Sequence, residues 1–248
     1  MLKSLDQKKK QLDTYRPLPK ELLNNLNEWF RIELTYTSNA IEGNTLTSSE
    51  TALIVEKGIT VGGKTLREHL EAINHAEAFD YIVYLAGVPN NKITLSDICT
   101  IDRLILRRIN DDNAGIVRKV LVKISGLDFT FPEPFKLQEL MEEFINWLHA
   151  TNDHPVIVAA DAHLKLVTIH PFVDGNGRTA RLLLNLLLIQ YGYPPALITP
   201  QERLEYINAL GLAQKSDQTD AYYTIIINAI ERSMNIYLEH AQHTLKQN

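Results

Sequence analysis

Apolar residues recur along most of the chain at the three- and four-residue spacing that places side chains on one face of a helix. The clearest stripe lies within 137–148 and consists of Leu137, Leu140, Met141, Phe144, Ile145 and Leu148. Similar patterns predict helices over 20–36, 66–83, 93–109, 156–169, 179–191, 202–212 and 221–240. A further helix is predicted to begin at Thr47-Ser48-Ser49-Glu50, whose residue types fit a capping box. The pattern therefore favours an all-α protein.

One stretch between these helices has a different period. Val120, Val122 and Ile124 alternate with Leu121 and Lys123, Ser125-Gly126 can turn, and Phe129 and Phe131 alternate after the turn. Alternation on both sides of a turn indicates a β-hairpin, here within 117–131. We therefore expect a helical bundle that carries one small β-hairpin.

The composition agrees with few turns and narrows the class of protein. The 248 residues include 11 Gly and 10 Pro, which is sparse for a sandwich or a barrel with many tight turns. The lone Cys99 excludes an internal disulfide and a zinc site built from paired cysteines. A formal net charge of −5 argues against a dedicated nucleic-acid-binding protein.

The apolar runs also bear on where the protein is found. The opening residues lack the apolar core of a signal peptide. The longest apolar run, 182–189, is interrupted by Asn185 and is far shorter than the roughly 20 residues that a membrane-spanning helix needs. We therefore expect a cytoplasmic protein that does not enter a membrane.

The segment with the most chemistry is HPFVDGNGRTAR, residues 170–181, which lies between two apolar helices. Pro171 disfavours the helical conformation at His170, so the first helix is expected to end there. Asp174-Gly175-Asn176-Gly177 has the composition of a turn, and a second helix is expected to resume at about Arg178.

The start of this second helix has an unusual charge. Helix N-termini favour acids, but Arg178 and Arg181 are expected near the first turn, three residues apart and on one face. Two cations at this pole are favourable when an anion lies between them, and backbone N–H groups of a glycine turn also bind anions. The segment therefore predicts a cradle for a polyphosphate.

Two further side chains complete a reaction at this cradle. Asp174 can hold Mg²⁺ together with phosphate oxygens and water. His170, at the lip of the turn, can accept a proton at neutral pH. Together they predict transfer of a phosphate-containing group to a hydroxyl.

Residues 170–181 match the motif HPFx(D/E)GNGRxxR of the Fic family at every defined position. Ser38-Asn39-Ala40-Ile41-Glu42-Gly43-Asn44 is similar to the inhibitory motif (S/T)xxxE(G/N) of the same family. The resemblance extends over roughly 17–240. It implies an all-α Fic fold that is one compact unit: an arm at 1–19, N-terminal helices with the inhibitory motif at 20–110, and a Fic core with a β-hairpin flap at 111–240. It also implies transfer of AMP from ATP, with Mg²⁺, to a Ser, Thr or Tyr hydroxyl of a protein.

The resemblance implies a role for each motif residue. His170 would be the general base, Asp174 would hold Mg²⁺, and Asn176 with the backbone of Gly175 and Gly177 would hold the α-phosphate region. The nucleotide's outer phosphates would bind Arg178 and Arg181, with Arg181 chiefly at the γ-phosphate. Tyr206 lies where relatives place a residue that contacts adenine.

The resemblance also implies regulation and target docking. Glu42, within the motif that begins at Ser38, would pair with Arg181 and prevent productive ATP binding. The hairpin residues Val120, Leu121 and Val122 would align a target segment by strand addition. In some relatives the same glutamate orients a water that removes AMP, so removal is an open alternative here, as are self-modification and a homodimer.

Three other interpretations compete with this one. Gly58-Ile59-Thr60-Val61-Gly62-Gly63-Lys64-Thr65 satisfies the P-loop pattern of nucleotide hydrolases and kinases, which requires a strand just before Gly58. His163, His170 and Asp174 could be metal ligands of a hydrolase if one continuous helix aligned them. A catalytically silent binding module is the third, because a fold does not guarantee activity.

Overall fold

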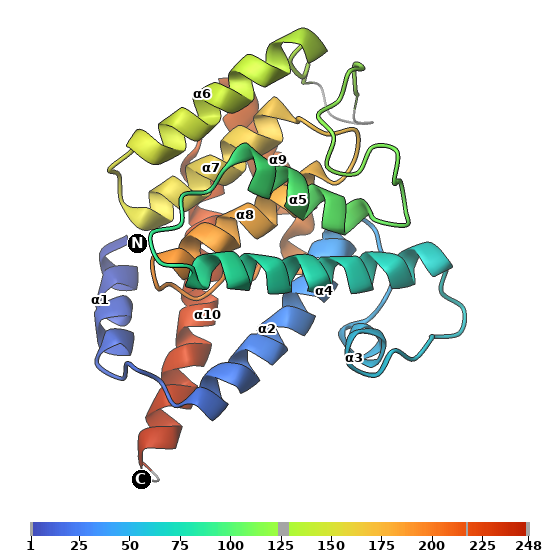
Figure 1. The fold of residues 1–248 in the computed structure, drawn as a ribbon. Helices are drawn as coiled ribbons and strands as arrows, with labels where there is room; N and C mark the ends of the chain where they lie inside the picture. The colour runs from blue at the N-terminus through green and yellow to red at the C-terminus, as the bar shows by residue number, and fades with distance from the viewer. Residues whose placement is uncertain (1, 124–128, 217, 247–248) are drawn as a thin grey trace.

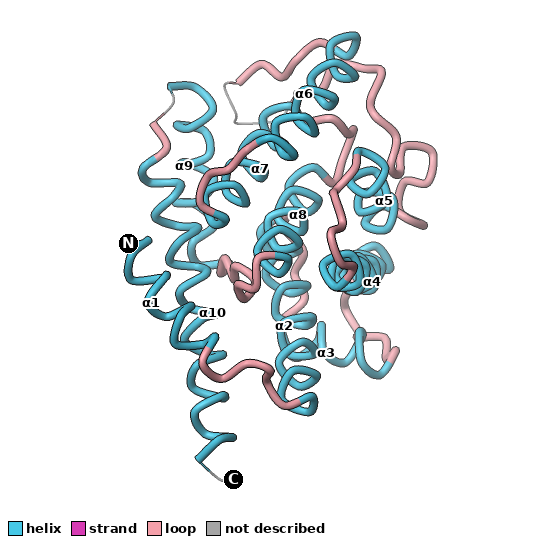
Figure 2. Tube along the Cα trace, turned by 60° about the vertical axis from the view of Figure 1, so that its left-hand side comes forward, coloured by secondary structure: helices cyan, strands magenta, loops and turns pink. Residues whose placement is uncertain are grey.

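The computed structural model describes residues 2–123, 129–216 and 218–246, and these residues form ten α-helices and two short 3₁₀ helices with no strand (Figure 2). The α-helices are α1 (Leu2–Asp13), α2 (Lys20–Ile41), α3 (Ser48–Lys57), α4 (Leu66–Gly87), α5 (Leu95–Leu106), α6 (Leu137–Ala150), α7 (Pro155–Ile169), α8 (Asn176–Gln190), α9 (Arg203–Ser216) and α10 (Asp220–Lys246). The 3₁₀ helices are η1 (Pro134–Lys136) and η2 (Pro200–Glu202). The expectation of an all-α fold is confirmed.

Helix α8 runs through the middle of the molecule, with α4, α5 and α7 packed around it (Figure 1). All its side chains from Arg178 to Leu188 are buried, and the leucines from Leu182 to Leu188 point to every side of the helix, as expected of a core helix. Each fully buried leucine of this run contributes about 1.5–3 kcal/mol of transfer free energy. The helix that carries the two arginines is therefore fixed by the core itself.

Most helix boundaries agree with the sequence predictions, and two regions differ. The helix predicted over 20–36 continues to Ile41, and the capping box between Thr47 and Glu50 is present. Residues 1–19, predicted to be an arm, contain α1. Leu5 and Leu12 are seven residues apart, so they lie on one helix face and are fully buried. That face packs α1 against α10.

The predicted β-hairpin over 117–131 is not present among its described residues, and 124–128 lie outside them. Instead, the guanidinium of Arg118 donates hydrogen bonds to the carbonyl oxygens of His170, Val120 and Pro132, each at 2.8 Å. The Arg118 backbone N–H donates to the Pro171 oxygen at 2.8 Å. Alternation indicates an extended chain, but a β-ladder also requires hydrogen bonds between two backbones. Here the carbonyl oxygens of Val120 and Pro132 accept from the Arg118 side chain instead.

The surroundings of the P-loop pattern differ from what that motif requires. The helix α3, not a strand, ends directly before Gly58, and α4 begins after Thr65. The ammonium of Lys64 donates to the backbone oxygen of Thr45 at 2.5 Å. The pattern therefore lies in a loop between two helices, without the strand that positions a phosphate-binding loop.

No helix in the described part of the chain is long and apolar enough to cross a membrane.

Candidate active site

The turn between α7 and α8 is held by its own side chains. The amide of Asn176 accepts from the N–H of Phe172 and donates to the Phe172 oxygen, both at 2.9 Å. The Phe172 ring is fully buried beneath the turn, as expected. His170 ends α7 with a φ of 52°, a left-handed conformation that is uncommon for a residue other than glycine. The turn is thus fixed from both sides of the motif.

The first turn of α8 is suited to bind an anion. Gly175 is the N-cap, with a φ of 80°, and no side chain caps the helix. A Cβ at this position would lie 2.6 Å from Oδ2 of Asp102, so both space and conformation require glycine. The uncapped amides leave the positive end of α8 available to a negative ligand.

Arg178, in the first turn, is almost fully buried yet incompletely paired. Its Nε and Nη1 atoms have no hydrogen-bond partner among the described residues. Nη1 lies 3.5 Å from Oε1 of Glu71, and Nη2 lies 3.4 Å from Oδ1 of Asp174. A buried guanidinium with unsatisfied donors is the arrangement that a phosphate or carboxylate oxygen completes.

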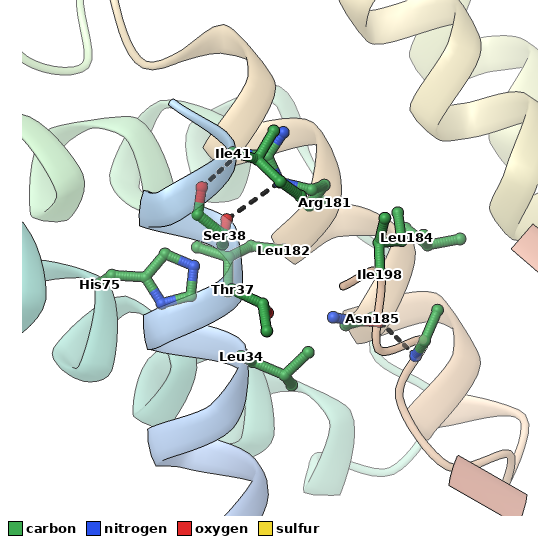
Figure 3. Close-up of a pocket in the computed structure, with 11 residues that line it drawn as sticks. Leu34, Thr37, Ser38, Ile41, His75, Arg181, Leu182, Leu184, Asn185 and Ile198 are labelled. Carbon is green, nitrogen blue, oxygen red and sulfur yellow. Dashed lines mark hydrogen bonds between the residues drawn. The ribbon is translucent and has the colours of Figure 1, made fainter. Parts of the chain in front are cut away.

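Arg181 lies in the second turn rather than in the first, because α8 begins at Asn176. Its Nε donates to Ser38 Oγ at 2.9 Å, and its Nη2 donates to the Ser38 backbone oxygen at 3.0 Å (Figure 3). Nη2 also donates to Oε1 of Glu42 at 2.7 Å. The side chain therefore bridges the end of α2 and α8, and Glu42 pairs with Arg181 as the resemblance to the Fic family implied.

The charges around this pair favour the ionised carboxylate. Burial raises the pKa of Glu42, but the positive charges of Arg181 and Arg178 outweigh burial and leave that pKa below its ordinary value. The Glu42 side chain keeps 41 % of its surface exposed, whereas Arg181 keeps 7 %. A Cβ on Gly177 would lie 2.5 Å from Oε1 of Glu42, so glycine at 177 allows the carboxylate to approach the turn.

His170 is in the protonation state that a general base requires. Its Nδ1 lies 3.2 Å from the Val167 oxygen, which can only accept, so the ring proton is on Nδ1, and no described residue hydrogen-bonds to Nε2. Burial and the nearby charge of Arg118 lower the pKa of His170 to about 4, despite the opposing effect of the Val167 oxygen. The ring packs against that of Phe131, with the centroids 4.0 Å apart and the two planes tilted by 31°.

Asp174 is the carboxylate available for a divalent cation. Its side chain is 40 % exposed, its Oδ1 accepts from the Gly175 N–H at 2.7 Å, and its Oδ2 lies 3.3 Å from Nη2 of Arg67. The described residues contain no cluster of three ligands that could hold a metal by themselves. The donor set fits Mg²⁺, which is commonly held by one carboxylate together with substrate phosphates and water.

The structure brings most of the predicted site residues to one cavity of about 500 Å³. The cavity is lined by Glu42, His170, Asp174, Gly175, Asn176, Gly177, Arg178, Arg181 and Tyr206, together with Ile41, Phe131, Val167, Val173, Arg203, Ile207, Leu210 and Gln214. Tyr206 is only 1 % exposed, and its contact with adenine stays a prediction. Val120, Leu121 and Val122 lie outside the cavity lining, with Val120 and Leu121 exposed.

Several residues that support the site were not identified from the sequence. Arg118, which holds the His170 carbonyl, is followed directly by Lys119 in an otherwise apolar stretch, and nothing in that pattern separates it from a surface cation. Arg67 contacts Asp174 from α4, far away in the sequence. Asp102 is fully buried beneath Gly175. Its place beside the apolar stripe Ile98, Ile101 and Ile105 was a usable signal, because an acid there must be buried.

The metal-hydrolase arrangement of His163, His170 and Asp174 is not formed. His163 is fully buried and contacts the hydroxyls of Tyr206 at 2.8 Å and Tyr222 at 2.9 Å. The turn at His170 ends α7, so the three side chains do not share one helix face.

Residues 92–188 match the Fic/DOC family. A protein named protein adenylyltransferase Fic from Drosophila virilis is 38 % identical over 238 residues, which cover 95 % of this chain and 48 % of that protein. A protein of the same name from Nematostella vectensis is 40 % identical over 206 residues, covering 82 % of this chain and 48 % of that protein. The chain thus spans about half the length of the curated relatives it matches.

Solved structures give the same result for the fold. A Fic domain containing signaling protein from Bacteroides thetaiotaomicron superposes with a TM-score of 0.84 at 29 % identity, covering 96 % of this chain and 97 % of that one. Fic-1 from C. elegans superposes with a TM-score of 0.86 at 29 % identity, covering 98 % and 74 %. The motif is intact, its histidine, turn and arginines line one cavity, and these relatives agree. Residues 92–188 of this chain are therefore a Fic domain.

Proposed function

We propose that this protein transfers AMP from ATP to a hydroxyl side chain of a protein and is held in an inhibited state by Glu42. The observation that carries the proposal is that His170, whose Nδ1 is taken by the Val167 oxygen, and the anion-binding start of α8 line the same cavity. The relatives named protein adenylyltransferase Fic support the same activity. The intact base, carboxylate and arginines disfavour a silent binding module.

The nucleotide would bind with its phosphates along the turn and the first turns of α8. Arg178 offers buried, unsatisfied N–H donors, and the uncapped amides after Gly175 add the positive end of the helix. Arg181 would meet the terminal phosphate once Glu42 no longer occupies its Nη2 atom. Asp174 would hold Mg²⁺, which would neutralise phosphate charge.

The reaction would proceed as a displacement at the α-phosphorus. Nε2 of His170 accepts the proton of the target hydroxyl, and the hydroxyl oxygen forms a bond to the α-phosphorus. The bond between the α-phosphorus and the bridging oxygen breaks, and pyrophosphate leaves. Because the pKa of His170 is about 4, the imidazole is neutral at pH 7 and ready to accept.

The target would dock along the segment that contains Val120, Leu121 and Val122. Val120 and Leu121 are exposed by 55 % and 64 %. Arg118 connects this segment to the His170 carbonyl, so a target lying along it would reach the catalytic histidine. Backbone pairing with the target would give the strand addition that the resemblance to the Fic family implies.

The inhibited state follows from the contacts of Arg181. Glu42 supplies a negative charge where a terminal phosphate would bind. It caps the C-terminus of α2, a position where an acid is unfavourable because the helix dipole is negative at that end. A charge-assisted hydrogen bond of this kind is worth roughly 1.5–3 kcal/mol. Because it is intramolecular, ATP must compete with a group that is always present.

Intact-mass spectrometry after incubation with ATP and Mg²⁺ tests the proposal. Glu42→Gly is expected to gain an AMP-sized mass, wild type only a weak addition, and Glu42→Gly with His170→Ala none. A lysate or peptide array labelled by Glu42→Gly would extend the test to other targets. If neither the chain nor any added protein gains AMP while ATP binds, AMP transfer is refuted.

A further inference from the structure

A second acid from outside the motif contacts the phosphate cradle from α4, the helix that packs against both α2 and α8 (Figure 1). Glu71 lies in the second turn of α4, and its Oε1 is 3.5 Å from Nη1 of Arg178. Nη1 has no hydrogen-bond partner among the described residues, so this contact brings two charges together without an aligned hydrogen bond. Arg178 therefore faces an acid, as Arg181 faces Glu42.

The orientation of the Glu71 carboxylate is fixed by a partner on each of its oxygens. Oε2 accepts from Nδ2 of Asn44 at 3.0 Å, and Oε1 accepts from Nε of Arg67 at 3.1 Å. Asn44 belongs to the segment that resembles the inhibitory motif and follows Glu42 by two residues. Asn39 of the same segment donates to the Glu71 backbone oxygen at 3.1 Å. This segment therefore holds two acids in place, its own Glu42 and Glu71 of α4.

The position of Glu71 is unfavourable for a phosphate at Arg178. A phosphate oxygen that hydrogen-bonds to Nη1 brings a negative charge to an atom that already lies 3.5 Å from Oε1 of Glu71. The side chain of Glu71 is only 13 % exposed and Arg178 is almost fully buried, so solvent screens the repulsion between the two anions poorly. The carboxylate of Glu71 therefore lowers the affinity of the cradle for phosphates.

We propose that Glu71 is a second inhibitory acid, which neutralises Arg178 in the resting protein while Glu42 neutralises Arg181. The ligand that it opposes is a polyphosphate, either free or as part of a nucleotide. Glu42 occupies a hydrogen-bond donor of its arginine, whereas Glu71 acts through charge. Removal of Glu42 alone therefore leaves part of the inhibition in place. The consequence of this contact for AMP transfer rests on the proposed function.

Glu71→Gln and Glu68→Gln form a matched pair for the test. Each substitution removes one negative charge from α4, and the two positions are three residues apart. The side chain of Glu68 bonds to Thr45 and Thr65 and, among the described residues, to no arginine. A general effect of charge on anion binding would therefore appear in both variants, whereas an effect through Arg178 appears only in Glu71→Gln.

The first measurement is the Kd of inorganic tripolyphosphate by calorimetry, which requires neither adenine nor catalysis. Glu71→Gln is expected to lower this Kd about tenfold in the wild-type and in the Glu42→Gly backgrounds, because the two acids face different arginines. Glu68→Gln should change it less than about twofold, because an exposed charge is screened. An unchanged Kd in Glu71→Gln, which a purely structural role would give, or a higher Kd overturns the inference. Absence of tripolyphosphate binding in every variant overturns it as well.

The second measurement is a double-mutant cycle by urea unfolding and needs no ligand. Glu71→Gln is expected to lower the folding constant about fivefold more when Arg178 is present than in Arg178→Met. Glu68→Gln should have the same effect in both backgrounds. Coupling to Arg178 that is absent, or equal for the two glutamates, overturns the inference.

ATP binding and AMP transfer in the same variants separate this inference from the proposed function. A parallel decrease in the Kd of ATP identifies a nucleotide as the ligand, and a decrease confined to tripolyphosphate identifies a free polyphosphate. Tighter binding in Glu71→Gln without AMP transfer in any variant supports the inference and refutes the proposed function. AMP transfer by Glu42→Gly with no change of either Kd in Glu71→Gln does the reverse. If Glu71→Gln does not fold, Glu71→Ala replaces it with Glu68→Ala as the control, because Nδ2 of Asn44 keeps its contact with the Glu68 backbone oxygen.

Discussion

The substitution Asp102→Asn tests how a buried carboxylate next to the turn supports the site. Asp102 lies on α5 and is fully buried. Its Oδ1 accepts from the Gly115 N–H at 2.8 Å, and its Oδ2 lies 3.4 Å from the Thr179 hydroxyl. Asparagine keeps the shape and the acceptor for Gly115 but removes the negative charge. The substitution therefore isolates the cost of a buried carboxylate.

The magnitude follows from the pKa of this carboxyl. Burial raises the pKa of Asp102 to about 7, although the Gly115 hydrogen bond and the charge of Arg178 act in the opposite direction. Since the protonated form is favoured in the folded state, stability from this group is complete below the ordinary value of 3.8 and is lost as pH rises towards 7. The full change corresponds to about 4 kcal/mol, of which about 2.5 kcal/mol falls between about pH 5 and pH 8.

Urea unfolding of wild type and Asp102→Asn at several pH values measures this effect. The unfolding free energy of the variant relative to wild type is expected to increase by about 2.5 kcal/mol between about pH 5 and pH 8. Asp112→Asn, an exposed position on the turn after α5, is the matched control and should show no such increase. A difference between Asp102→Asn and wild type that does not change with pH would refute the reasoning.

Four further outcomes are expected. Ser38→Ala removes the acceptor of Arg181 Nε but keeps the Glu42 contact. It should lower the unfolding free energy, measured in urea, by roughly 1.5–3 kcal/mol. It should also raise AMP transfer, measured by intact mass, less than Glu42→Gly does. The kcat/KM of Glu42→Gly should be constant from about pH 6 to pH 8 and fall below about pH 4, where the His170 base becomes protonated; a fall between pH 6 and pH 7 would contradict the low pKa. Arg118→Ala should make the segment 116–123 sensitive to limited proteolysis and reduce AMP transfer to a protein target, because the carbonyls that Arg118 holds are released. The Kd of ATP should stay unchanged, since these carbonyls lie outside the phosphate cradle. Lys64→Ala should leave the Kd of ATP unchanged within about twofold by calorimetry, because Lys64 bonds to Thr45 and not to the cavity; a loss of binding would restore the P-loop interpretation.

The sequence alone determined the helices and the chemistry of the motif. Helical periodicity depends on residues three or four positions apart, so the stripe in 137–148 predicted α6 (Leu137–Ala150) closely. The motif at 170–181 also carries its own turn chemistry, because Pro171 restricts the backbone before it and Gly175 permits the left-handed conformation of the turn. The position of the helix start was less exact, and Arg181 lies one turn later than predicted.

The tertiary structure decided which distant groups meet at the cavity. Glu42 and Arg181 are 139 positions apart, and their contact depends on α2 and α8 packing together. The sequence indicated this pair only through a resemblance to relatives. For Asp102, 77 positions from Thr179, the neighbouring apolar stripe could indicate burial, but its partners are known only from the fold.

The segment around Val120 shows why local pattern is insufficient for a strand. Its alternation predicted an extended chain, but a ladder depends on a partner backbone elsewhere. The guanidinium of Arg118 instead satisfies the carbonyls of Val120 and Pro132. Backbone dihedral preferences act within a few residues, whereas hydrogen-bond partners, burial and pKa values depend on everything packed nearby. The sequence therefore determined the elements and the reactive groups, and the packing of the helices determined their partners and their charge states.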